Sequence, residues 1–129
     1  MSYSLLIADD DSHYRKMIFN YFEERDFEIS VLSKGEKVLK ALINNTVDFA
    51  IIDYHLPEMG GFEILDRLSS YDIETSIIII TKDSSPEIEQ EIRKFSPDFL
   101  FVKPFNIEDL GSVITNLIRT KSTIRKFAY

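Results

Sequence analysis

Short apolar runs alternate along the chain with longer stretches in which apolar side chains recur at helical spacing. The runs have the length of buried strands and predict them at 4–9, 28–32, 48–53, 76–80 and 99–102. The amphipathic stretches predict helices at 12–25, 35–44, 85–95 and 106–120, and one more after Gly61 that bears Phe62, Leu65 and Leu68. This alternation predicts an α/β fold with a five-stranded parallel sheet of order 2-1-3-4-5 and helices on both faces.

Four of the five predicted strands end in polar residues, although a fully buried strand should stay apolar up to its turn. Asp9 and Asp10 end the first strand, Asp53 the third, Thr81 the fourth and Lys103 the fifth. The carboxyl ends of parallel strands share one edge, and the order of the sheet changes direction between the first and third strands. The three acids are therefore predicted to meet in one crevice there.

Carboxylates that lie close together repel one another, and this repulsion must be offset by protons or positive charge. At an effective dielectric near 20, two like charges roughly 5 Å apart cost about 3 kcal/mol. Raised pKa values, the ammonium of Lys103 or a divalent cation could offset this cost. A site of oxygen ligands suits Mg²⁺, and beside it an Asp carboxylate can attack phosphorus while the Thr81 hydroxyl donates to a phosphoryl oxygen. Taken singly, Asp9–Asp11 could be a solvated turn and helix cap, and Lys103–Pro104 an ordinary turn.

Composition narrows the class of protein. The 129 residues suit one domain, expected at 1–121 with a basic tail at 122–129. The net charge of −7 argues against nucleic-acid binding by this chain, and the absence of cysteine excludes disulfides and thiolate metal sites. No apolar run is long enough for a membrane span, and no secretory signal precedes the first strand. A cytoplasmic protein without membrane contact is the simplest interpretation.

Together, these residues resemble the receiver domains of two-component response regulators, which have the CheY-like form of the flavodoxin-like fold. The resemblance rests on the acidic pair Asp9–Asp10, on Asp53 followed by Pro57-x-Met59-Gly60-Gly61, on Thr81, and on Lys103-Pro104-Phe105. It covers nearly the whole chain. Each motif is weak alone, and the combination is specific.

The resemblance implies a role for each matching residue. Asp53 would be the phosphoacceptor. Mg²⁺ would be bound by Asp10, Asp53 and the backbone carbonyl of His55, and by Asp9 largely through water. Lys103 would pair with the phosphoryl group.

The remaining implied roles concern switching. Thr81 would move toward the phosphoryl group, and the bond before Pro104 would be cis. Two positions depart from the family pattern: Lys82 stands where a small residue is usual, and Leu100 stands where an aromatic switch residue is common. We expect Lys82 to affect donor access or dephosphorylation. His55 could influence hydrolysis or simply be exposed.

The resemblance implies a signalling switch rather than an enzyme, with slow autodephosphorylation at most. A histidine kinase or a histidine phosphotransfer protein would donate the phosphoryl group, with Mg²⁺ and no small-molecule cofactor. The modified 85–120 face would then change its downstream protein partner.

Three alternatives stay open from the sequence. A haloacid-dehalogenase-like phosphatase also uses an Asp nucleophile, but it places a second Asp where this chain has His55. Flavin binding on the same fold is disfavoured because Asp9–Asp11 would repel the cofactor phosphate. A receiver-like scaffold that is never phosphorylated is favoured only by the departures at Lys82 and Leu100.

Overall fold

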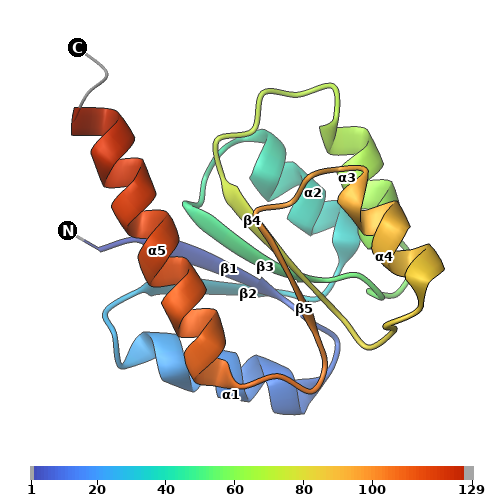
Figure 1. The fold of residues 1–129 in the computed structure, drawn as a ribbon, viewed down its shortest axis with the longest axis horizontal. Helices are drawn as coiled ribbons and strands as arrows, with labels where there is room; N and C mark the ends of the chain where they lie inside the picture. Colours follow the sequence, from blue (N-terminus) through green and yellow to red (C-terminus); the bar gives the residue numbers. More distant parts are fainter. Residues whose placement is uncertain (1, 127–129) are drawn as a thin grey trace.

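The computed structural model describes the backbone of residues 2–126 and the side chains of residues 2–121 (Figure 1). Its strands are β1 (Ser4–Ala8), β2 (Glu28–Leu32), β3 (Phe49–Asp53), β4 (Ser76–Thr81) and β5 (Phe99–Val102). Its helices are α1 (Ser12–Glu23), α2 (Gly35–Ile43), α3 (Gly61–Leu68), α4 (Pro86–Arg93) and α5 (Ile107–Lys126). The predicted alternation of strands and helices is confirmed.

All strand pairs are parallel, and the sheet order is β2-β1-β3-β4-β5, as predicted. Side chains of a strand point alternately to the two faces of the sheet, so the sheet contributes to two hydrophobic cores, one on each face. Leu6, Ile52 and Ile79 pack with α2, α3 and α4, whereas Leu5 and Ile51 pack with α1 and α5 on the opposite face. Figure 1 shows the two groups of helices on either side of the sheet.

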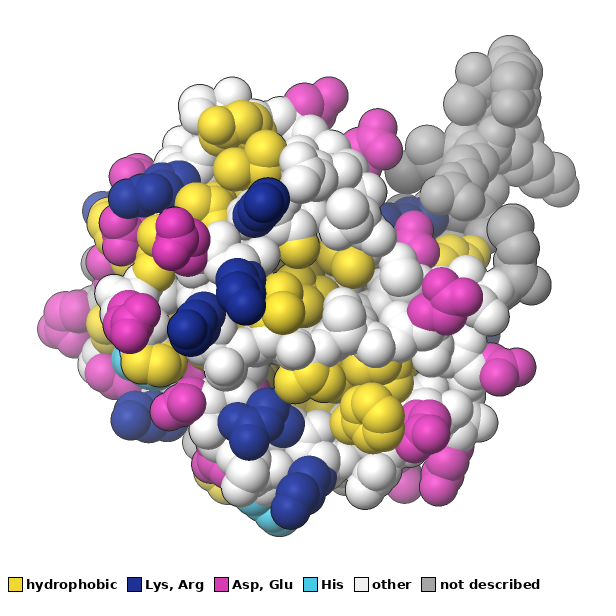
Figure 2. All heavy atoms as spheres, turned by 180° about the vertical axis from the view of Figure 1, so that it is seen from behind, with side chains coloured by type: hydrophobic (Ala, Val, Ile, Leu, Met, Phe, Trp, Pro, Cys, Tyr) yellow, Lys and Arg dark blue, Asp and Glu magenta, His cyan; other side chains and the backbone are white. Residues whose placement is uncertain are grey.

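The three central strands are buried almost throughout, which explains their continuous apolar sequence. The edge strand β5 exposes Phe99 and Val102. Seen from behind, the surface mixes acidic, basic and hydrophobic side chains (Figure 2). None of the described helices is both long and apolar enough to cross a membrane.

The predicted end of the last helix at 120 was wrong. Helix α5 continues to Lys126, because no Gly or Pro follows Thr120 to terminate it. The backbone of 122–126, predicted as part of a basic tail, is therefore helical. Residues 127–129 of that tail lie outside the described part of the chain.

Gly35 lets α2 approach the loop between β3 and α3. A Cβ atom placed on Gly35 would overlap the backbone oxygen of Met59 and lie 2.8 Å from the Met59 Cβ. A Cβ on Gly60, in the same loop, would meet nothing closer than the Tyr54 oxygen at 3.4 Å. The close packing at Gly35 helps to fix the loop that follows Asp53.

We predict that Gly35→Ala destabilises the protein by roughly 1–3 kcal/mol, because the loop backbone must move to admit the methyl group. Gly60→Ala is the matched control and should change the unfolding free energy by less than about 1 kcal/mol. Urea unfolding of both variants followed by circular dichroism measures the difference. Equal unfolding free energies for the two variants would contradict this account of the packing.

Candidate functional site

The site lies at the carboxyl edge of the sheet, where Lys103 bridges two acids. Asp9 follows β1, Asp53 ends β3, and the Lys103 Nζ lies 3.0 Å from an Oδ2 atom of each. Asp9 is fully buried, Asp53 is 6% exposed and the Lys103 side chain is 9% exposed. The structure therefore brings Asp9, Asp53 and Lys103 together. Of the three acids predicted to share one crevice, Asp9 and Asp53 do so.

Backbone amides hold one oxygen of each carboxylate. The His55 N–H donates to Asp53 Oδ1 at 2.8 Å, and the Asp11 N–H donates to Asp9 Oδ1 at 2.9 Å. Lys103 also donates to Asp9 Oδ1, at 3.3 Å. The buried Oδ2 of Asp9 receives no hydrogen bond from the described residues, so its contact with Nζ is an ion pair without a hydrogen bond.

These surroundings shift the pKa values of the two acids in opposite directions. Burial raises the pKa of Asp9 from 3.8 to about 6, and the nearby Asp53 adds to the shift. Burial would also raise the pKa of Asp53, but hydrogen bonds from the His55 amide and contacts with Asp9 and Lys103 hold it below its ordinary value. Burial opposes the charge of Lys103, yet the two acids raise its pKa overall. As the pH falls, Asp9 therefore takes up a proton before Asp53 does.

Asp10 was also predicted to lie in this crevice, but its side chain does not join the cluster. Its side chain is exposed, while the Arg15 guanidinium donates to the backbone oxygens of Asp9 at 3.0 Å and Asp10 at 2.9 Å. Asp11 caps α1 by accepting from the His13 N–H. Among the side chains that the structure describes, no group of three His, Asp or Glu residues is placed to hold a metal ion. The Mg²⁺ ligand set stays a prediction.

Thr81 is brought to the same edge but contacts a different residue. Its hydroxyl is buried, lies 2.8 Å from His55 Nε2 and accepts a hydrogen bond from the Asp83 N–H at 3.1 Å. Hydrogen bonds from Ser85 hold the pKa of the Asp83 carboxyl below its ordinary value. Within the described residues, no hydrogen bond joins Thr81 to Asp53. The contact between His55 and Thr81 was not foreseen, because nothing in sequence spacing indicates which loop side chain turns over a neighbouring strand.

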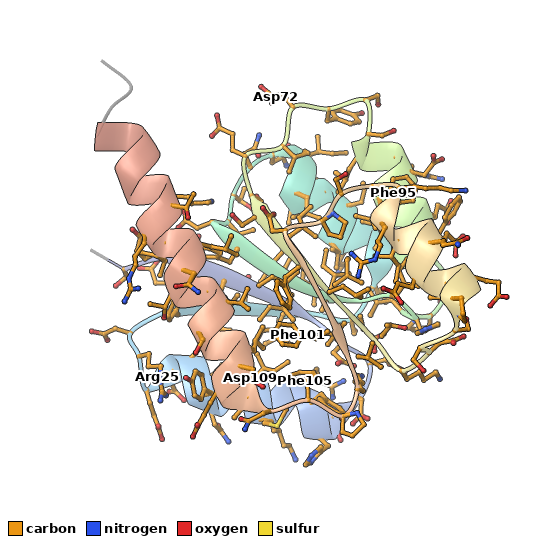
Figure 3. All side chains as sticks on the ribbon, viewed as in Figure 1. Arg25, Asp72, Phe95, Phe101, Phe105 and Asp109 are labelled. Carbon is orange, nitrogen blue, oxygen red and sulfur yellow. The ribbon has the colours of Figure 1, made fainter. Side chains whose placement is uncertain are left out.

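Aromatic side chains line the path of Lys103. Its Nζ lies 4.3 Å from the centre of the Tyr14 ring, and Tyr14 packs on Phe105 with ring centres 5.6 Å apart. Figure 3 shows Phe105 next to Phe101 near the start of α5, and their ring centres are 5.3 Å apart. The Lys103–Pro104 bond is cis, the isomer that the resemblance implies. Tyr14 lies in the helix predicted at 12–25, and the sequence did not indicate that its ring lies beside Lys103.

Among the described residues, no hydrogen bond or ion pair joins either of the two departures from the family pattern to the acid cluster. Lys82 is exposed directly after β4. Leu100 is half-buried and packs against the core formed with α2, α3 and α4, whereas Phe101 faces the opposite core.

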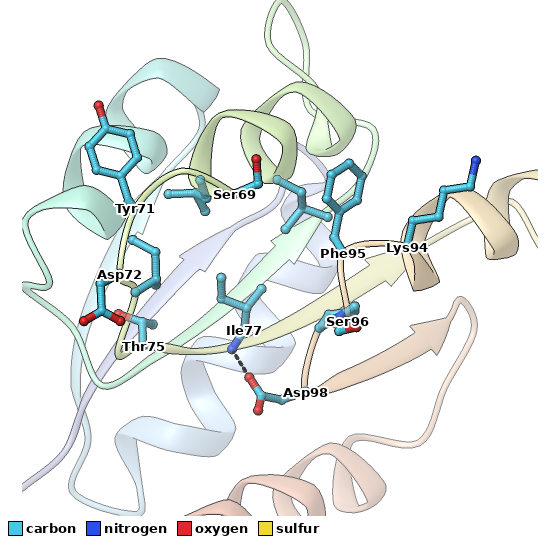
Figure 4. Close-up of a pocket in the computed structure, with 13 residues that line it drawn as sticks. Ser69, Tyr71, Asp72, Thr75, Ile77, Lys94, Phe95, Ser96 and Asp98 are labelled. Carbon is cyan, nitrogen blue, oxygen red and sulfur yellow. Dashed lines mark hydrogen bonds between the residues drawn. The ribbon is translucent and has the colours of Figure 1, made fainter.

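A cavity of about 490 Å³ lies at the other edge of the sheet (Figure 4). Its lining includes Leu65, Tyr71, Phe95 and Asp98, and the Asp98 carboxylate accepts from the Ile77 N–H at 2.7 Å. The amino ends of β4 and β5 border this cavity, so it is separate from the acid cluster.

Comparison with known proteins identifies the family. The model for the response regulator receiver domain matches residues 5–115. The chain belongs to the response regulator receiver domain family. Such domains work in two-component systems with kinases and downstream effectors.

Relatives of this receiver domain are regulatory proteins of greater length. It is 30% identical over 124 residues to the transcriptional regulatory protein SrrA of Staphylococcus aureus, covering 95% of this chain and 51% of SrrA. It is 25% identical to the regulatory protein AtoC of Escherichia coli over 118 residues, covering 92% of this chain and 26% of AtoC. The receiver domain thus spans about half the length of SrrA and about a quarter of the length of AtoC.

Solved structures agree in fold. The receiver domain of the Francisella response regulator 1452 is 31% identical with a TM-score of 0.79, over 95% of this chain and 99% of that one. A CheY-like receiver domain protein from Methanospirillum hungatei JF-1 is 23% identical with a TM-score of 0.85, over 95% and 98% of the two chains.

We predict that Asp9→Asn stabilises the protein at pH 7.5 in the absence of divalent cations. Because the folded-state pKa of Asp9 is raised, its stability contribution is complete below about pH 4 and is lost as pH rises through about 6. The difference from 3.8 to about 6 corresponds to about 3 kcal/mol at pH 7.5. The gain from the substitution should therefore vanish by pH 4.

Chemical unfolding at both pH values in EDTA measures this difference. Asp10→Asn is the control: its exposed side chain should leave the unfolding free energy within about 0.5 kcal/mol at either pH. A loss of stability in Asp9→Asn at pH 7.5 would show that the charged form of Asp9 supports the fold.

Proposed function

We propose that this receiver domain accepts a phosphoryl group on Asp53 from a phosphohistidine, carried by a histidine kinase or a histidine phosphotransfer protein in the cytoplasm. The observation that carries the proposal is the ionised Asp53 carboxylate held 3.0 Å from the Lys103 ammonium at the carboxyl edge of the sheet. A carboxylate in this state is a competent nucleophile.

The transfer follows from these groups. A carboxylate oxygen of Asp53 forms a bond to phosphorus as the phosphorus–nitrogen bond of the donor breaks, and the released imidazole takes a proton from water if it leaves as the anion. Lys103, already 3.0 Å from Asp53, is placed to pair with the added negative charge. The His55 amide keeps the carboxylate oriented through Oδ1.

The donor set fits Mg²⁺. The buried Asp9 Oδ2 has no hydrogen-bond donor among the described residues, and two acids outnumber the one ammonium between them. Asp9, Asp10, Asp53 and the backbone carbonyl of His55 would hold the ion, all with the hard oxygen ligands that it prefers. When bound, Mg²⁺ supplies the positive charge that phosphoryl oxygens require.

The output surface in this proposal is the 85–120 face. Thr81 ends β4 and leads into the loop before α4, so a movement of Thr81 reaches that face directly. The exposed Phe99 and Val102 of β5 provide apolar area for a downstream protein partner. Leu100 supplies no aromatic ring to report the change. Lys82, exposed beside Thr81, would affect donor access or dephosphorylation.

The proposed role is phosphoacceptor rather than phosphatase. An enzyme that turns over phosphate esters through Asp53 needs an acid to protonate the leaving group. Two residues beyond Asp53 stands His55, whose Nε2 is engaged with Thr81.

We predict that incubation with acetyl phosphate and Mg²⁺ adds one phosphoryl group, read as an increase in intact mass. Asp53→Asn should show no increase, because the amide is not a nucleophile. EDTA should abolish the modification in the wild-type protein, since the added charge is then poorly neutralised.

Asp48→Asn provides a matched control. Asp48 also lies beside β3, but its carboxylate accepts from Ser4 far from the phosphoacceptor edge. That variant should be modified like the wild type. Modification that persists in Asp53→Asn would refute the assignment of the acceptor, and no modification from either acetyl phosphate or a phosphohistidine donor would favour the scaffold alternative.

A further inference from the structure

His55 contacts both the phosphoacceptor and the switch residue. Its backbone N–H donates to Asp53 Oδ1 at 2.8 Å, and its Nε2 lies 2.8 Å from Thr81 Oγ1. The ring also packs edge-on against Tyr54, with ring centres 5.7 Å apart, and Tyr54 is buried. The imidazole is thus fixed on one side by packing and at its tip by the threonine.

The single hydroxyl proton of Thr81 is already donated to a hydrogen-bond acceptor in the resting structure. The Asp83 N–H donates to Oγ1 at 3.1 Å, and the Asp83 carbonyl oxygen lies 3.3 Å from Oγ1. If His55 Nε2 accepts, the hydroxyl proton is used there; if Nε2–H donates, the proton goes to the Asp83 carbonyl. In both tautomers the hydroxyl must leave these partners before it can donate to a phosphoryl oxygen.

We propose that His55 is a positioning residue that holds Thr81 in its resting place through the Nε2–Oγ1 hydrogen bond. This inference rests on the proposed phosphorylation of Asp53. Loss of the hydrogen bond makes the engaged position of Thr81 more accessible, because the resting state alone is weakened. The hydrogen bond stabilises the resting position of Thr81. Part of the free energy gained when Thr81 binds the phosphoryl group is therefore offset by the loss of this bond.

The surroundings give this role to His55. The half-buried Leu100 packs toward the core on the α2–α4 side and carries no polar group to hold the hydroxyl. The exposed Lys82 has no hydrogen bond to the Thr81 hydroxyl among the described residues. His55 belongs to the β3–α3 loop, which begins directly after Asp53. Through its backbone N–H and its Nε2, it contacts both the proposed site of modification, Asp53, and the switch residue, Thr81.

The test is the affinity of the full chain for beryllofluoride with Mg²⁺, an inorganic mimic of the phosphoryl group, followed by amide NMR. His55→Leu should bind beryllofluoride roughly 2- to 12-fold more tightly than the wild type, the range expected for one hydrogen bond lost from the resting state only. His55→Gln places an amide near the Nε2 position and should restore affinity to near that of the wild type. His13→Leu, a change at the other histidine of the chain, should have no effect.

A double-mutant cycle separates this role from a general structural one. Thr81→Val removes the hydroxyl with little change of shape, and in that background His55→Leu should leave the affinity unchanged. Tighter binding that persists without the hydroxyl would overturn the proposal. Equal affinity of His55→Leu and wild type would overturn it as well, and weaker binding would show that His55 contacts the phosphoryl group instead.

The wild-type protein offers a second readout that does not depend on a variant folding. The ¹⁵N shift of His55 Nε2 should change when beryllofluoride binds, because Thr81 leaves it. If the ¹⁵N shift stays unchanged although beryllofluoride binds, the positioning role of His55 is refuted, whereas the proposed phosphorylation of Asp53 is not. A wild-type protein that neither binds beryllofluoride nor gains mass from acetyl phosphate would instead refute the proposed function, and the inference with it.

Discussion

The buried contact of one ammonium with two carboxylates is the interaction on which the functional edge depends. Removing charged groups from water costs several kcal/mol for each, and the mutual attraction offsets this only when partners are close. Lys103 lies 3.0 Å from both Asp9 and Asp53, yet one negative charge stays unbalanced and one oxygen of Asp9 lacks a donor. The resting protein is therefore strained electrostatically at the place where phosphoryl chemistry is proposed.

The fold makes this contact possible by its connectivity. Lys103 is 94 residues from Asp9 and 50 residues from Asp53, and only the strand order brings the three together. Neighbouring strands β1 and β3 place the acids side by side, while the Lys103 side chain reaches across from β5. Tyr14 and the aromatic rings behind it support the extended lysine.

The sequence predicted this convergence well, because strand periodicity and right-handed crossovers leave few arrangements for five such units. It predicted less about directions of individual side chains. Asp9 and Asp10 are adjacent, yet Asp9 is buried and Asp10 is exposed, because the chain leaves the sheet after Ala8 and turns toward α1. The His55–Thr81 contact and the ring of Tyr14 beside Lys103 depend on rotamers, which no periodicity encodes.

A ¹³C NMR titration of the aspartate carboxyl groups in the metal-free protein tests the central electrostatic claim most directly. Asp9 should titrate near pH 6 and Asp53 below its ordinary value, and replacing Lys103 with Met should raise the pKa of Asp53. Ordinary, independent titration of both acids, unaffected by loss of Lys103, would contradict the account.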